Sequence, residues 1–167
     1  MIEALLRDLR QPEYIHVLLN PLPLYGLALS LIGLVIAVIS RSRPAKIATL
    51  VIVFLSALSA WPVFEYGEQA YDPVLSMSDE PGQGWLSAHR ARAEQFITFF
   101  YALAALAAIA LIAPIKWPKS SGPLAICVIL LGVVVLGMGG YVGYAGGKVR
   151  HCEFRSGPPP PKAESSP

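Results

Sequence analysis

Residues 120–147 read SSGPLAICVILLGVVVLGMGGYVGYAGG, which is 28 consecutive residues without Asp, Glu, Lys or Arg. The hydrocarbon core of a bilayer is ~30 Å thick, and ~20 residues of α-helix cross it. Three further stretches are also free of charge over at least 18 residues, namely 14–40, 47–64 and 95–115. Leu, Ile, Val and Ala dominate all four stretches without polar and apolar alternation, which argues against barrel strands. We therefore predict an all-α integral membrane four-helix bundle with both termini on the same side. The spans are expected at about residues 22–40, 46–65, 94–114 and 123–145.

The composition agrees with this class. Of the 167 residues, 54% are hydrophobic and 14% are charged, against about 25% charged in an ordinary soluble domain. A net charge of +2 is too small for a surface that follows a phosphate backbone, so nucleic acid is excluded as a partner. Two cysteines exclude a disulfide framework. Residues 1–155 are expected to form the transmembrane domain, and the Pro-rich residues 156–167 a disordered tail.

Two segments interrupt the regular pattern. The sequence Asn20-Pro21-Leu22-Pro23 lies inside the first uncharged stretch, and proline disfavours the α region for the residue before it. We expect a short interfacial segment at 14–19, separate from a spanning helix that begins near Leu24. Residues 67–92 are expected to form a 26-residue loop, with a turn at Asp79-Glu80-Pro81-Gly82.

The positive charges suggest an orientation. The two short turns between spans carry five of the thirteen Lys and Arg residues and no acid. The positive-inside rule gives most weight to Lys and Arg close to the helix ends. We expect a multi-pass protein of the bacterial inner membrane, with the turns in the cytoplasm and both termini in the periplasm.

All three histidines fall at the termini side of the membrane. His16 precedes the first span, His89 leads into the third, and His151 follows the fourth. Glu68 and Glu153 lie on the same side, and imidazole with carboxylate suits first-row metals, whereas paired imidazoles suit haem iron. The candidate cofactor ligands are therefore His16, His89 and His151, and a metal ion could also take Glu153 and Glu68. The alternative is that these histidines only anchor the helices at the interface.

The fourth span is rich in glycine. It contains Gly139-x-x-x-Gly143 and Gly143-x-x-x-Gly147, a spacing of small residues that lets helices approach closely. Three roles stay open for it: packing within the chain, contact with a flat cofactor, or contact with a second protomer in a homo-oligomer.

Four strings resemble those of a known group of proteins. His16-Val17-Leu18-Leu19-Asn20-Pro21-Leu22-Pro23 resembles a His-x-x-x-Asn-His-x-Pro opening, and Gly67-Glu68-Gln69-Ala70 resembles a Gly-Glu-x-Ala element. His89 followed by Ala93 is similar to a His-Glu-x-x-Ala motif. Residues 146–153, GGKVRHCE, are similar to a closing Gly-Gly-x-Ile-Arg-His-x-Glu.

These strings belong to small uncharacterised four-helix bacterial membrane proteins close to the family called domain of unknown function 2231. The resemblance covers most of residues 14–155 and implies the chemistry of four-helix haem cytochromes. It places all three histidines on motif positions. Two positions depart from the pattern, because Pro21 stands for the second histidine of the opening and Arg90 for the glutamate after His89. A site that uses those two residues is incomplete in this chain.

Three functions compete. The first is a haem- or metal-binding electron-transfer component that holds haem b or a transition-metal ion and serves a membrane redox partner. The second is a non-catalytic accessory or assembly subunit of a larger membrane complex, with no cofactor. The third, a small transporter, is disfavoured because no charge lies within a span and no inverted repeat is visible.

Overall fold

The computed structural model describes residues 2–160, and these contain helices and no β-strand. The elements are α1 (Ile2–Asp8), α2 (Pro12–Leu19), the π-helix η1 (Leu22–Gly26), α3 (Leu27–Ile39), α4 (Arg43–Leu58), α5 (Ala60–Ser76), α6 (Glu80–Lys116), the 3₁₀-helix η2 (Pro118–Ser120), α7 (Ser121–Arg150) and the 3₁₀-helix η3 (Cys152–Phe154).

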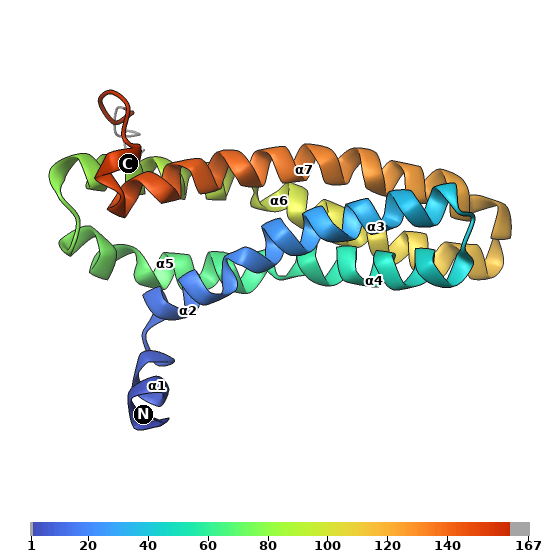
Figure 1. Ribbon diagram of the computed structural model, residues 1–167, viewed down its shortest axis with the longest axis horizontal. Coiled ribbons are helices and arrows are strands. Elements are labelled where there is room, and N and C mark those ends of the chain that lie inside the picture. Colours follow the sequence, from blue (N-terminus) through green and yellow to red (C-terminus); the bar gives the residue numbers. More distant parts are fainter. Residues whose placement is uncertain (1, 161–167) are drawn as a thin grey trace.

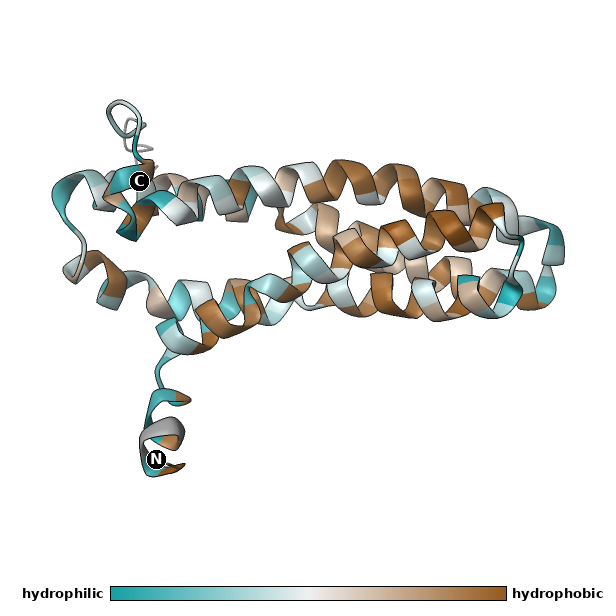
Figure 2. Cartoon of the chain, in the orientation of Figure 1, coloured by the Kyte–Doolittle hydropathy of each residue, from teal (hydrophilic) through white to brown (hydrophobic). Residues whose placement is uncertain are grey.

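Four helical segments are long and apolar enough to cross a membrane, as predicted, and they run Pro12–Ile39, Arg43–Ser76, Glu80–Lys116 and Pro118–Arg150. They form an elongated bundle in which the start of α2 and the end of α7 lie at the same end (Figure 1). We call this the histidine end, and we call the opposite end, with residues 40–42 and 117–120, the turn end. Apolar residues cover the ribbon along the half of the bundle nearer the turn end (Figure 2).

The Pro-containing segment does not separate two helices as expected. Asn20, Pro21 and Gly26 all keep right-handed helical dihedral angles, so α2 continues through η1 into α3. The irregularity is present as one turn of π-helix at Leu22–Gly26. A π-turn displaces the regular hydrogen bonds by one residue, which accommodates the missing N–H groups of the two prolines.

The expected loop at 67–92 is wrong. Helix α5 continues to Ser76 and α6 begins at Glu80, so only residues 77–79 are non-helical. Asp79 caps α6, because its Oδ1 accepts a hydrogen bond from the N–H of Gly82 at 3.2 Å. The apparent turn is therefore a helix N-terminus. The two extensions are held by a small apolar cluster, which contains Tyr71, Val74, Leu75, Trp85, Leu86, Ala145 and Val149.

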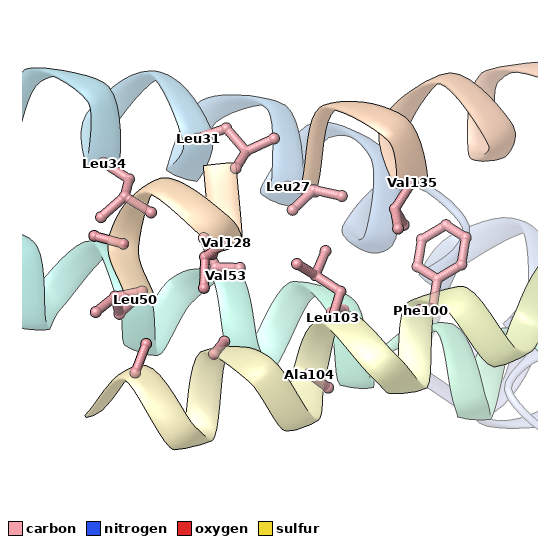
Figure 3. Packing of buried hydrophobic residues seen from close by; sticks show 14 of the residues in the cluster. Leu27, Leu31, Leu34, Leu50, Val53, Phe100, Leu103, Ala104, Val128 and Val135 are labelled. Atoms are coloured by element: carbon pink, nitrogen blue, oxygen red, sulfur yellow. The ribbon is translucent and has the colours of Figure 1, made fainter. Parts of the chain in front are cut away.

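The main core joins α3, α4, α6 and α7. Its labelled members in Figure 3 are Leu27, Leu31 and Leu34 of α3, Leu50 and Val53 of α4, Phe100, Leu103 and Ala104 of α6, and Val128 and Val135 of α7. The three leucines recur at helical spacing and so form one buried face of α3. At Gly132 of α7 a Cβ atom would lie 2.6 Å from Cδ2 of Leu31, so this glycine allows α3 and α7 to approach closely.

After α7 the chain turns back along α6. The guanidinium of Arg155 donates to the Asp79 carboxylate at 2.9 Å and to the carbonyls of Val149 and Lys148 at 2.7 Å each. Arg155 therefore joins the end of α7 to the start of α6. Of the tail expected at 156–167, Pro159 lies against α6, where a Cβ atom on Gly84 would be 2.8 Å from it. Residues 161–167 of that tail lie outside the described residues.

Candidate functional site

His16 lies on α2 and is held by the neighbouring helix α5. Its Nδ1 is 2.8 Å from the carbonyl oxygen of Val63. A carbonyl oxygen only accepts hydrogen bonds, so Nδ1–H is the donor and, in the neutral imidazole, Nε2 carries a free lone pair. The backbone of α5 thus fixes both the orientation and the tautomer of this ring.

His89 lies on α6 and is held in the same way by α7. Its Nδ1 is 3.0 Å from the carbonyl oxygen of Val142, so Nδ1–H donates and Nε2 is again available. A histidine that binds a metal commonly donates its other ring N–H to a backbone carbonyl or a carboxylate, which fixes the ring and raises its basicity. Both histidines have this arrangement.

The structure brings His16 and His89 together. Their ring centroids are 6.1 Å apart and their planes meet at 83°. Two imidazoles that bind opposite faces of one metal through nitrogen atoms ~2.0–2.1 Å from it would have centroids ~6 Å apart. The observed centroid separation is close to this value, and in the structure the two rings meet edge to face.

A glycine stands behind each imidazole. A Cβ atom on Gly67 would lie 3.0 Å from Cε1 and Nδ1 of His16, and one on Gly146 would lie 3.0 Å from the same atoms of His89. Gly67 follows Val63 by four residues, and Gly146 follows Val142 by four, so in each case the glycine lies one helical turn beyond the accepting carbonyl. Each ring therefore packs on helix backbone that lacks a side chain.

The site consists of two matched halves. In one, α2 supplies the histidine and α5 supplies Val63-x-x-x-Gly67; in the other, α6 supplies the histidine and α7 supplies Val142-x-x-x-Gly146. Both histidines could be predicted from the sequence, whereas the two valine-glycine pairs were not. The signal that could have found them is the spacing V-x-x-x-G, which occurs in the spanning segment after the one that carries each histidine.

Both histidines line a cavity of about 490 Å³. Its wall is mainly apolar and comes from α2, η1, α5, α6 and α7, with Leu24, Phe96 and Phe100 among the larger side chains. Gly139 and Gly143 of α7 also line it, and a Cβ atom on Gly139 would lie 2.8 Å from Cδ2 of Leu24. Part of the glycine-rich sequence therefore serves packing within the chain and the shape of this cavity. Cβ atoms on Gly137, Gly140 and Gly147, by contrast, would meet nothing within 4 Å.

Charged side chains line the cavity as well. Arg90 pairs with Glu68 at 2.6 Å and with Glu94 at 3.0 Å, and its guanidinium lies 4.7 Å from the centre of the Tyr71 ring. Arg150 donates to the carbonyl of Met77 at 2.9 Å. Glu68 is thus an ion-pair partner of Arg90.

His151 and Glu153 lie apart from this pair. His151 follows α7, stacks on Phe154 with ring centroids 4.9 Å apart, and has its Nδ1 2.9 Å from the Glu153 carboxylate. Both side chains are more than half exposed. A backbone N–H and the contact with His151 hold the pKa of Glu153 below its ordinary value. Among residues 2–160 no three His, Cys, Asp or Glu side chains are grouped so that they could hold a metal ion.

Comparison of the chain with protein-family models, with curated proteins and with solved structures finds no match.

Proposed function

We propose that the chain is a multi-pass membrane protein that binds a b-type haem between His16 and His89 and transfers electrons. The observation that carries this proposal is the neighbouring pair of imidazoles, with centroids 6.1 Å apart and both Nδ1–H groups donated to helix carbonyls. Each ring keeps Nε2 as its ligand atom, and the two rings come from different halves of the bundle.

The exposed surface supports a membrane location. Leu29, Ile39 and Leu130 expose 70%, 76% and 64% of their surface, and all lie within segments long enough to span a bilayer. Large exposed apolar surfaces on a soluble monomer are rare, whereas lipid is an apolar solvent for these side chains.

A haem fits the donor set better than a bare metal ion does. Residues 2–160 offer two neighbouring imidazoles and no third His, Cys, Asp or Glu grouped with them, and a first-row ion bound by protein alone takes four or more ligands. A haem brings four nitrogen ligands of its own, so one or two protein ligands are sufficient to hold its iron. The mainly apolar cavity of about 490 Å³ falls within the range for ligand sites, ~300–1,000 Å³.

The roles of the residues follow from this arrangement. A bound haem would supply one-electron redox chemistry. His16 and His89 would hold the haem iron through Nε2, while the carbonyls of Val63 and Val142 would hold the rings in place. Apolar side chains such as Phe96 and Phe100 would exclude water from the site. The guanidinium of Arg150, which lines the same cavity and forms no ion pair among the described residues, is suited to pair with a carboxylate of the ligand.

The proposed location is the inner membrane of a bacterium, with the turn end in the cytoplasm and the histidine end in the periplasm. This orientation rests on the five Lys and Arg residues at the turns, where no acid accompanies them. A redox partner would then approach the site from the periplasmic side.

The experiment that tests this function is absorbance spectroscopy of the detergent-purified protein, before and after reduction with dithionite. The expected result is the Soret and visible bands of a six-coordinate low-spin haem, with about one haem per chain by the pyridine haemochrome assay. A preparation from haem-replete cells that shows neither bands nor haem would contradict the proposal.

A further inference from the structure

The turn end of the bundle is strongly basic. Its five cationic residues are Arg41, Arg43, Lys46, Lys116 and Lys119, and no Asp or Glu occurs in residues 14–64 or 95–152. Among residues 2–160, none of these five takes part in an ion pair. The charge at this end is therefore not neutralised by the part of the chain that the structure describes.

Two of these cations line a second cavity of about 180 Å³ between α4, α6 and the start of α7. Lys46 is half-buried, and its Nζ donates to the hydroxyl of Ser121 at 3.0 Å. An ammonium group has three N–H donors, so Lys46 can hold an anion in the cavity and keep this bond. Arg43 lies one turn before it on the same helix and adds a guanidinium to the same wall.

The rest of the cavity is apolar. Ile47, Leu50, Leu111 and Ile115 line it, and Ile47 and Ile115 expose 48% and 79% of their surface. A free phosphate would gain nothing from these side chains. A phospholipid would place its phosphate near the two cations and the start of its acyl chains along the isoleucines.

We propose that this cavity binds the headgroup of an anionic phospholipid, with Lys46 and Arg43 holding the phosphate and Ile47 and Ile115 contacting the chains. The proposal rests on the membrane location proposed above and is independent of the haem. Basic pockets between transmembrane helices are known sites for anionic headgroups. Bound there, the lipid joins α4 to the α6–α7 turn.

The test uses the full chain reconstituted into vesicles of equal parts phosphatidylglycerol and phosphatidylcholine. The protein is extracted, purified in 1 M NaCl, and the lipids that remain bound are measured by mass spectrometry. Surface attraction is suppressed under these conditions, because the Debye length is ~3 Å. Three variants are compared with the wild type: Lys46→Gln, Lys46→Arg, and Lys119→Gln, which removes the same charge at the same end but outside the cavity.

We expect the wild type to retain phosphatidylglycerol over phosphatidylcholine. Lys46→Gln should reduce this preference about tenfold, since hydrogen bonds to charged groups contribute more than neutral ones. Lys46→Arg should retain it, and Lys119→Gln should change it less than about twofold, because an exposed charge is screened at this salt concentration. Equal losses in Lys46→Gln and Lys119→Gln, or no preference in the wild type, would overturn the proposal.

Two further readings separate the possible failures. Excess inorganic phosphate should not displace the phosphatidylglycerol; displacement would mean that the cavity binds a free anion, and the lipid proposal would be wrong. The haem absorbance of the same samples should be the same in all variants. Absence of haem from every sample would contradict the electron-transfer function alone, and absence of the protein from the membrane fraction would contradict its location.

Discussion

Gly146 lies directly behind the imidazole of His89: a Cβ atom on this glycine would be 3.0 Å from Nδ1 and Cε1 of the ring. The ring cannot move away without lengthening its 3.0 Å hydrogen bond to Val142. The absence of a side chain at position 146 is therefore part of what positions the histidine.

Gly146→Ala should weaken haem retention while the bundle remains folded. Alanine is more favourable than glycine in a helix by up to ~1 kcal/mol, but overpacking commonly costs ~1–3 kcal/mol. At this position the added methyl group would push on the imidazole of His89. The measurement is haem content per chain after purification, with helicity followed by circular dichroism. Gly147→Ala is the matched control, because a Cβ atom there meets nothing within 4 Å. Equal haem content in the two variants would count against the positioning role.

The ion pair between Asp79 and Arg155 should make the contact between the start of α6 and the end of α7 sensitive to acid. The hydrogen bonds and charge of Arg155 hold the pKa of Asp79 below its ordinary value. The folded-state pKa is thus lower than the unfolded-state pKa, so the stabilisation is complete above the unfolded value and is lost as pH falls through the folded one. Hydrogen-exchange protection factors of the first turn of α6 should therefore fall in acid.

Asp79→Asn should remove most of this pH dependence, because asparagine keeps an oxygen for the N–H of Gly82 but has no charge to lose. Glu80→Gln serves as the control, since Glu80 is adjacent and forms no ion pair among the described residues. If the pH dependence persists in Asp79→Asn and disappears in Glu80→Gln, the titrating carboxylate is that of Glu80 and the prediction is wrong.

The proposed orientation predicts the outcome of reporter fusions. A periplasm-only reporter fused after the C-terminus should be active, and the same reporter fused at Ser42, in the turn between α3 and α4, should be inactive. Activity at Ser42 alone would reverse the orientation. Activity at both positions would contradict the pairing of the termini on one side.

The number and place of the apolar helices could be predicted from the sequence because lipid imposes a length and a composition on a spanning segment. How far α5 and α6 extend beyond the apolar stretches could not be predicted from the sequence. Trp85 and Leu86 stabilise that region through contacts with Tyr71 and with α7, and such contacts between distant segments leave no period in the local sequence. For the same reason Asp79 was interpreted as part of a turn, although it caps a helix.

The histidines were identified, but which of them meet could not be derived from their position at one side of the membrane. His16 and His89 lie on neighbouring helices within the bundle, whereas His151 follows the last turn of α7 and pairs locally with Glu153. We predicted that the three histidines meet, with Glu68 and Glu153 as further ligands. Whether they meet depends on the directions of the side chains, which only the packing of the helices determines. Glu68 contacts Arg90 instead.

The haem ligands are tested most directly by the absorbance spectra of three single variants, His16→Ala, His89→Ala and His151→Ala, purified in parallel with the wild type. We expect the first two variants to lose the six-coordinate low-spin bands, since each removes one of the two histidine ligands. His151→Ala should keep the wild-type spectrum and haem content. Membrane insertion of all three should be unchanged, because it depends on the apolar helices. Low-spin bands of wild-type intensity in His16→Ala or His89→Ala, or their loss in His151→Ala, would contradict the assignment of the ligands.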